Sequence, residues 1–388
     1  MKKQTRFLLP FSVMIVVIVA AAVWRTWGPD GALHTWPDLD GGLYTESVNY
    51  QGLRYFVPPD EVYASGLTPE DRPALNDPDM VSIATVDAKL ADELEGIAVT
   101  VGSEHYFYPF QILNWHEVVN ASLNGLSLVI TYSPLSGSAV VYEDERKFAD
   151  AGKVYNNTLL LAAEDDDTLW SQTMGQSVVG EGVGELLTTY PSTVMSWATW
   201  KDLYPSGLAL STDTGYARDY GRHPYASYET SPAVFFPLNH TFGKIAPKDL
   251  VYRLNIPGRE SIVFLDRYLP AQTDANMDVG EGEYQDSVVA FYDEAQDVVR
   301  AFNRKTDGQT LTFEQKGKKI TDAETGSSWS ATGLAIGGAL TGTQLAELPL
   351  TRHYAFAHFA MYPNSLISGQ ELLPTEDVLE EGIEFDVE

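Results

Sequence analysis

The residues best suited to chemistry occupy one short stretch and one later loop. Trp115, His116 and Glu117 are consecutive, and Ser133 and Ser136 flank a Pro-Leu pair further along the chain. A histidine close to a hydroxyl can form a general base and nucleophile pair, and a neutral imidazole can instead bind a metal. Neither serine lies in the Gly-x-Ser-x-Gly pattern of a nucleophile elbow. We therefore expect a histidine that satisfies buried carbonyls and serines that stabilise a turn, and we take this stretch as the best candidate for a binding pocket.

A second group combines two arginines with a histidine. Arg218, Arg222 and His223 lie close together in an acidic chain. Arginine can hold a carboxylate or phosphate through two parallel hydrogen bonds, so this group and Trp115 are candidates for ligand binding. Pairing of the arginines with neighbouring Asp or Glu is the competing interpretation, and the acidic composition favours it.

A third group has the alternating oxygen-bearing residues of a calcium loop, namely Asp274, Asn276 and Asp278. It does not match the EF-hand pattern, because positions six and twelve are Val279 and Gln285. We expect a solvated acidic loop and keep calcium as the weaker alternative.

Four tryptophans, Trp170, Trp197, Trp200 and Trp329, could line a sugar-binding surface. Trp197 and Trp200 are three positions apart on an expected helix, so they share one of its faces. Packing in the core is the expected role of all four.

The composition excludes several classes of function. The 388 residues contain no cysteine, which rules out disulfides, thiolate metal sites, iron–sulfur clusters and cysteine nucleophiles. Asp plus Glu number 54 against 25 Lys plus Arg, and the formal net charge is -29. That charge opposes attraction to phosphate backbones, so we expect no nucleic-acid partner. The sequence identifies no cofactor and no protein partner.

The N-terminus predicts contact with a membrane. Residues 1–6 contain three basic side chains, and an apolar run interrupted only by Pro10 and Ser12 follows at 7–24. The run is about as long as a membrane-spanning helix requires, and its basic end should stay in the cytoplasm. We expect residues 1–24 to form a single-pass anchor, with the bulk of the chain extracytoplasmic. Cleavage of a signal peptide after the small residues 20–22 would instead give a secreted protein.

The remainder is expected to fall into four parts. Residues 25–75 are rich in Gly, Pro and Asp and predict an extended stalk with little regular structure. Residues 371–388 hold eight acidic side chains and no basic one, which predicts a solvated tail. Between them we expect two homologous units, at 76–245 and 246–370.

Several landmarks at nearly one offset suggest an internal duplication. Residues 128–132 and 288–292 have similar strand-like patterns at an offset of 160, and Trp170 and Trp329 are 159 apart. Each tryptophan is followed by a Gly-punctuated stretch and then a Tyr-Pro pair, at 204–205 and 362–363.

Each unit is predicted to be a mainly β, sandwich- or barrel-like lobe of a β-rich α+β fold. Short β-branched and aromatic runs between turn residues indicate strands at 126–132, 139–143 and 310–313. Short helices are expected at 110–120 and 194–203, the second with Ser192 or Thr193 as its N-cap.

Five motifs stand out between residues 73 and 367. They are Pro-Ala-Leu-Asn-Asp-Pro at 73–78, Tyr-Pro-Phe-Gln-Ile-Leu-Asn-Trp-His-Glu at 108–117, Ser-Pro-Leu-Ser-Gly at 133–137, Leu-Trp-Ser-Gln at 169–172 and Asp-Tyr-Gly-Arg-His-Pro-Tyr at 219–225. Together they resemble the DUF3179 family, exported or membrane-anchored prokaryotic proteins of unknown function, so the resemblance implies an architecture and no activity. The third motif usually reads Cys-Pro-Leu-Cys-Gly in that family. If the family uses that pair for metal or thiol chemistry, Ser133 and Ser136 cannot support it in the same way.

These observations favour a membrane-anchored extracytoplasmic binding or scaffold module. The alternative is a hydrolase or metal-assisted enzyme centred on His116, Ser133 and Ser136, which requires the imidazole and a hydroxyl to meet in a cleft. A calcium-stabilised surface protein is a third, less favoured hypothesis.

Overall fold

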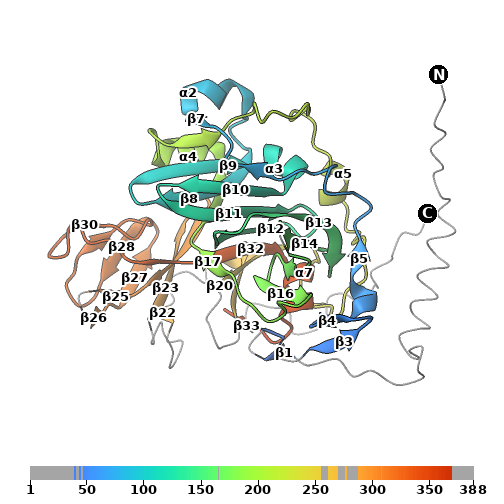
Figure 1. The fold of residues 1–388 in the computed structure, drawn as a ribbon. Coiled ribbons are helices and arrows are strands. Elements are labelled where there is room, and N and C mark those ends of the chain that lie inside the picture. The colour runs from blue at the N-terminus through green and yellow to red at the C-terminus, as the bar shows by residue number, and fades with distance from the viewer. Residues whose placement is uncertain are drawn as a thin grey trace.

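Strands dominate the chain. The computed structural model describes residues 47–164, 166–254, 261–269, 287–306 and 308–368, with short strands at 39–40, 43–44 and 276–277. It is 43% strand and 13% helix, which confirms the mainly β prediction (Figure 1). The expected anchor at 1–24 and the acidic tail at 371–388 lie outside the described residues. Of the helices that are described, none combines the length and the apolar character needed to cross a membrane.

A nine-stranded sheet runs through both halves of the chain. Its order is β33 (Leu366–Ile367), β21 (Ile262–Leu265), β20 (Leu250–Leu254), β32 (Leu350–Tyr354), β12 (Ser138–Glu143), β11 (Leu126–Ser133), β10 (Val118–Leu123) and β6 (Leu75–Asn76), with β17 (Thr188–Tyr190) also on β12. Ala139 of β12 pairs with Arg352 of β32, so a residue from the second half lies beside the strands of the first. In Figure 1 the red β32 accordingly lies against the green β12.

Two further sheets belong mainly to the first half. One has the order β3 (Val48–Tyr50), β4 (Leu53–Tyr55), β16 (Gln176–Val179), β15 (Leu169–Ser171), β14 (Thr158–Ala163), β13 (Phe148–Tyr155) and β5 (Tyr63–Ala64). The other has the order β18 (Thr193–Ser196), β8 (Glu95–Val101), β9 (Glu104–Pro109), β19 (Leu208–Leu210) and β7 (Met80–Ser82). The short strands β3 to β6 come from the segment expected to be a stalk. Phe56 and Val57 of that segment are buried in the core, so residues 47–75 differ from the expectation of an extended stalk.

Smaller sheets lie in the second half of the described chain, and one lies at 39–44. They are β22 (Asn276–Met277), β23 (Val288–Asp293), β24 (Val298–Asn303) and β31 (Glu347–Leu348); β27 (Phe313–Lys316), β28 (Lys319–Asp322), β29 (Ser328–Trp329) and β30 (Ala335–Gly337); β25 (Lys305–Thr306) with β26 (Gln309–Thr310); and β1 (Leu39–Asp40) with β2 (Leu43–Tyr44). The helices are η1 (Pro59–Glu61), α2 (Ile83–Val86), η2 (Asp87–Lys89), α3 (Phe110–His116), α4 (Trp197–Leu203), α5 (Ala226–Glu229), η3 (Asp266–Tyr268) and α7 (Ala355–Met361).

One pattern of strand pairing occurs in both halves. In the first half β8 pairs antiparallel with β9 and β18, and β19 runs parallel to β9. In the second half β20 pairs antiparallel with β21 and β32, and β33 runs parallel to β21. Helix α4 directly follows β18 as α7 directly follows β32. The glycines with positive φ at 175, 180 and 184 match those at 333, 338 and 342, each pair 158 positions apart.

Both expected helices exist but are shorter than predicted. Helix α3 stops at His116 because Glu117 has a left-handed φ of 57°, and the β-branched pair Val118–Val119 begins β10. Helix α4 begins at Trp197, after β18, and its N-cap is Ser196, whose side chain accepts from the backbone N–H of Thr199. The N-cap prediction at Ser192 or Thr193 was therefore wrong, since Thr193 belongs to β18.

The tryptophans belong to the core, as expected. Trp197 and Trp200 stack with ring centroids 5.3 Å apart, and both pack against Phe107. Trp170 and Trp329 are buried in the first and second halves respectively. The predicted strands at 126–132 and 139–143 match β11 and β12, whereas 310–313 is divided between β26 and β27.

Candidate functional site

Helix α3 is the element that positions the candidate site. Pro109 precedes it in an extended conformation, and the N–H of Glu117 closes it on the carbonyl of Leu113 at 2.7 Å. Consecutive helical residues point about 100° apart, so neighbouring side chains at the end of α3 reach different parts of the molecule. The four residues from Asn114 to Glu117 all contact one irregular segment, the loop at 220–225, which we call the wall loop.

Two side chains of the Trp-His-Glu motif hold the first part of the wall loop. Trp115 Nε1 donates to the carbonyl of Arg222 at 3.2 Å. His116 Nδ1 lies 2.7 Å from the carbonyl of Pro73, so that nitrogen carries the proton, and Nε2 accepts from the Tyr220 hydroxyl at 2.6 Å. His116 is fully buried, and burial lowers its pKa although the Pro73 carbonyl opposes the shift. His116 is therefore a neutral bridge between two segments.

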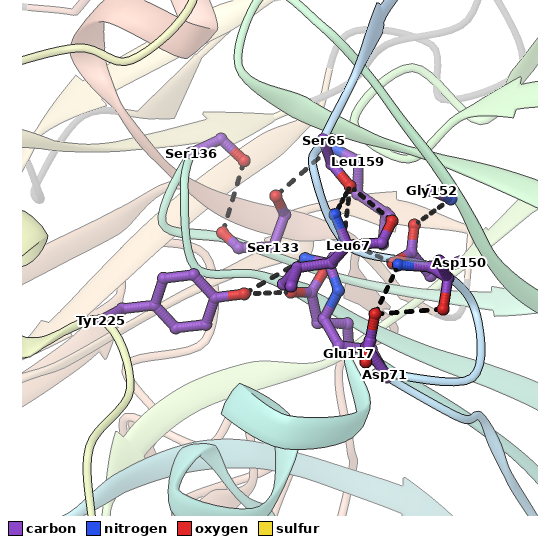
Figure 2. Close-up of polar contacts among 12 residues, drawn as sticks. Ser65, Leu67, Asp71, Glu117, Ser133, Ser136, Asp150, Gly152, Leu159 and Tyr225 are labelled. Carbon is purple, nitrogen blue, oxygen red and sulfur yellow. Dashed lines mark hydrogen bonds and ion pairs between the residues drawn. The ribbon is translucent and has the colours of Figure 1, made fainter. Parts of the chain in front are cut away.

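Glu117 holds the end of the wall loop through a buried charge network. Its Oε1 lies 2.5 Å from Arg72 Nη1 and accepts from the Tyr225 hydroxyl at 2.9 Å. Arg72 Nη2 also pairs with Asp150 at 2.6 Å and donates to Ser65 at 3.0 Å. Figure 2 shows Tyr225 and Asp150 approaching this network from opposite sides. Burial raises the pKa of Glu117 to about 7 against the effect of Arg72, and it raises the pKa of Asp150 in the same way.

The two serines belong to a separate network. Ser133 Oγ accepts from the backbone N–H of Leu159 at 3.3 Å, and Ser136 Oγ lies 2.7 Å from Ser138 Oγ. Ser138 in turn donates to Gln172 at 2.6 Å. Figure 2 shows Ser133 and Ser136 beside the Arg72 network, with hydrogen bonds of their own. The structure thus does not bring either hydroxyl into hydrogen-bond contact with His116, whose ring nitrogens bond to Pro73 and Tyr220.

A cavity of about 420 Å³ opens between α3, the wall loop and β32. That volume lies within the range of about 300–1,000 Å³ that is typical of small-molecule sites. Its buried lining includes Phe110 and Asn114 of α3, Tyr132 of β11 and Arg352 of β32, and His223 stands at its exposed rim. The Phe110 and Tyr132 rings stack with centroids 3.9 Å apart. Residues distant in sequence therefore converge here because β32 inserts beside β12.

Two carboxylates of the cavity wall, Glu95 and Glu229, each lie beside a basic side chain. Arg352 Nη1 lies 2.6 Å from Glu95, and its guanidinium lies 5.3 Å from the centre of the Phe110 ring. Burial lowers the pKa of Arg352, but the neighbouring Glu95 carboxylate more than offsets this effect and holds the pKa above its usual value. His223 Nε2 lies 3.0 Å from Glu229, and burial raises the pKa of Glu229 while His223 opposes the shift.

Two buried side chains in this wall keep an unpaired polar atom. Asn114 is 4% exposed and Arg352 is 5% exposed. Within the described chain neither Asn114 Oδ1 nor Arg352 Nε has a hydrogen-bond partner. A buried polar group without a partner costs about 1–3 kcal/mol, so a ligand that forms hydrogen bonds with these two atoms would remove that cost.

The predicted arginine group divides between two places. Arg222 and His223 line the cavity. Arg218 lies elsewhere, where Nη2 donates to the backbone carbonyl of Asp71 at 2.7 Å and the guanidinium lies 5.8 Å from the Trp115 ring centre. Among the described residues, Arg218 and Arg222 form no ion pair, so the expected pairing with Asp or Glu does not occur there.

No metal centre is found in the part of the chain that the structure describes, where no three of His, Asp or Glu come together as metal ligands. Of the calcium candidates, Asn276 begins β22, and Asp274 and Asp278 lie outside the described residues.

Comparison with known proteins gives a family and no activity. The family model described as a protein of unknown function, DUF3179, matches residues 70–365, which include the wall loop, α3 and β32. The chain belongs to the DUF3179 family. No curated protein and no solved structure matches it. The match extends across both halves of the central sheet, so the cavity lies wholly inside the family region of this DUF3179 protein.

Of the site residues predicted from the sequence, Arg222 and His223 line this cavity, and the others do not, namely Trp115, His116, Glu117, Ser133, Ser136 and Arg218. Asn114 lies inside a motif that the sequence already marked, and its place one turn after Phe110 would have put both on one face of α3. Arg352, Glu95 and Arg72 gave no such signal, since each lies far in sequence from the residue it pairs with. The run at 350–354 reads Leu-Thr-Arg-His-Tyr, so a charged residue did not stand out there.

Proposed function

We propose that this DUF3179 protein is a membrane-anchored extracytoplasmic binding protein whose ligand occupies the cavity beside Asn114 and Arg352. The observation that carries the proposal is the pair of buried, unpartnered polar atoms in the wall of a cavity of about 420 Å³. A ligand that forms hydrogen bonds with these side chains removes the free-energy cost of leaving their buried polar atoms without a partner.

The Trp-His-Glu motif supports this function by shaping the cavity. Trp115, His116 and Glu117 each bond to the wall loop, and that loop supplies Tyr220 and His223 to the lining. Residues that hold a loop in place act on binding without contacting the ligand. We do not extend the proposal to hydrolysis, because the His116 nitrogens bond to Pro73 and Tyr220 and the serine hydroxyls bond elsewhere.

The membrane anchor rests on the apolar run at 7–24 and the basic residues before it. The full chain should fractionate with membranes, and a chain lacking residues 7–24 should be soluble. Added protease should degrade the bulk of the anchored chain in intact spheroplasts. Recovery of the full chain in the soluble fraction contradicts the anchor.

We also propose that the units at 76–245 and 246–370 arose by duplication. The same pairing pattern supports this proposal, since it occurs among β8, β9, β18 and β19 and again among β20, β21, β32 and β33. The glycines with positive φ that recur at an offset of 158 support it as well.

The cavity itself is tested by screening a chemically broad fragment library with ligand-observed NMR. Binding should be lost in Gln111→Trp, because Gln111 lies half-buried in the lining and an indole there fills the space. Gln309→Trp, on the exposed strand β26, is the matched control. A library in which no fragment binds in a Gln111-dependent manner refutes the binding function.

A further inference from the structure

Each of the two carboxylates beside the cavity interior, Glu95 and Glu229, lies next to a basic side chain. Arg352 Nη1 lies 2.6 Å from a Glu95 carboxylate oxygen, and His223 Nε2 lies 3.0 Å from a Glu229 carboxylate oxygen. The two other charged residues of the lining, Glu93 and Arg222, are exposed at the rim and opposite in sign. An anionic ligand would compete with Glu95 for the guanidinium, and a cationic ligand would compete with Arg352 for the carboxylate. Only the guanidinium of Arg352 is buried, whereas Glu95 is exposed. A cation that drew Glu95 away would leave the buried guanidinium without its counter-ion, which is costly, and the Glu95 carboxylate repels an anion, so neither kind of ion is favoured.

Paired carboxylate and guanidinium groups suit hydroxyls instead. A hydroxyl donates one hydrogen bond and accepts two, so it can bond to both members of such a pair without separating them. Asn114 adds an amide, and Gln111 of α3 adds a second one at the cavity edge. The wall therefore offers donors and acceptors side by side, each on a planar side chain.

The rest of the lining is apolar or aromatic. Leu94, Leu250 and Tyr354 line the cavity between the polar groups, and the stacked pair of Phe110 and Tyr132 forms its buried side. Gly137 brings the backbone close to the Tyr354 ring, where an added Cβ would lie 3.0 Å from the ring carbons. A ligand with an apolar face and a hydroxylated edge matches these surfaces better than a wholly polar one.

From this arrangement we propose that the ligand is an uncharged saccharide of one or two sugar rings. The proposal rests on the binding function proposed above and adds the chemical class of the ligand. The ring C–H face packs on the aromatic and aliphatic side chains, and the hydroxyls bond to the Arg352–Glu95 pair and to the amides.

The test is isothermal titration of the full chain in detergent with a defined panel of probes. The neutral probes are glucose, N-acetylglucosamine and cellobiose. Their charged counterparts are glucuronate and glucosamine, and a blocked alanine amide and citrate represent other classes. We expect at least one neutral sugar to bind, with a Kd at least about tenfold lower than that of either charged counterpart, which corresponds to about 1.4 kcal/mol.

Three variants locate the binding. Gln111→Trp and Asn114→Leu should each raise the Kd of that sugar at least about tenfold, or about 1.4 kcal/mol. Gln309→Trp should leave the Kd unchanged, and thermal melting should confirm that all three are folded. If Asn114→Leu does not fold, Gln111→Trp alone decides the location.

The outcomes separate the two proposals. A charged sugar that binds as tightly as its neutral counterpart overturns the saccharide proposal, as does sugar binding that survives Gln111→Trp. If only the amide or citrate binds, and does so in a Gln111-dependent manner, the saccharide proposal is wrong and the binding function stands. If no probe binds, the saccharide proposal fails, and the fragment screen decides the binding function independently.

Discussion

The buried charge network makes a prediction about how stability depends on pH. One guanidinium, that of Arg72, lies between two buried carboxylates, Glu117 at 2.5 Å and Asp150 at 2.6 Å. A single positive charge cannot neutralise both carboxylates, so one proton stays on the pair far above the usual carboxyl range. Burial accordingly raises the pKa of Glu117 from 4.5 to about 7.

The sign of the effect follows from proton linkage. Between pH 4.5 and about 7 the folded protein keeps a proton on Glu117 that the unfolded chain has released. The resulting stabilisation is present in full below pH 4.5 and is lost as the pH rises through about 7. The rise in the pKa spans about two and a half pH units, and each is worth about 1.4 kcal/mol, so the loss is about 3 kcal/mol.

The measurement is urea denaturation of the wild-type chain and Glu117→Gln at about pH 5 and about pH 8. Glutamine keeps the shape of the side chain and has no titrating proton. We expect the free energy of unfolding of the wild type to fall by about 3 kcal/mol more than that of Glu117→Gln over this interval. The comparison cancels the repulsion among the other acidic groups, because it is common to both chains. Parallel profiles for the two proteins would refute the assignment of the proton to Glu117.

Two further predictions concern stability. Arg72→Met leaves two buried carboxylates without their cation and should lower the free energy of unfolding in urea by about 3–5 kcal/mol. Lys201→Met, at a more exposed pair, should lower it by about 1 kcal/mol. Equal losses contradict a structural role for the buried network. Gly175→Ala and Gly333→Ala should each cost about 2–4 kcal/mol, because both have positive φ and a Cβ would lie 2.7 Å from the Tyr142 ring and 2.6 Å from the Phe302 ring respectively. The control Gly317→Ala has positive φ but open space and should cost about 1 kcal/mol, and a similar loss in all three variants argues against the tight packing.

The individual strands and helices could be predicted from the sequence because local rules determine them. The alternating run at 126–132 and the Asn124-Gly125 turn predict a hairpin, and both turn residues have positive φ in the structure. The end of α3 was missed because no glycine marks it. Glu117 adopts the left-handed conformation instead. Its contacts with Arg72 and Tyr225 stabilise this conformation, which local propensity disfavours.

The cavity could not be predicted from the sequence because its walls come from residues and strands that pair over long sequence separations. Arg352 meets Glu95 over a separation of 257 residues, and β32 reaches β12 only because the two halves share a sheet. The pattern of a strand tells which faces are apolar and does not tell which distant strand becomes its neighbour. The sequence singled out His116 and Glu117, but their partners Tyr220 and Tyr225 lie in a loop whose course no local pattern predicts.

The connection between the halves explains why the site lies where it does. The pairing pattern of β8, β9, β18 and β19 recurs in the second half as that of β20, β21, β32 and β33. Residues 211–249 join β19 to β20 and lie outside this repeated pattern of strands. The wall loop belongs to this connection, and an irregular segment has few backbone hydrogen bonds to hold it. Trp115 bonds to the backbone of this loop, and His116 and Glu117, at the end of α3 and just after it, bond to the hydroxyls of Tyr220 and Tyr225. A role in holding the connection accounts for a polar motif in only one half. A linker that spans two packed halves and is fixed by side chains can close a cavity without disturbing the strands beneath it.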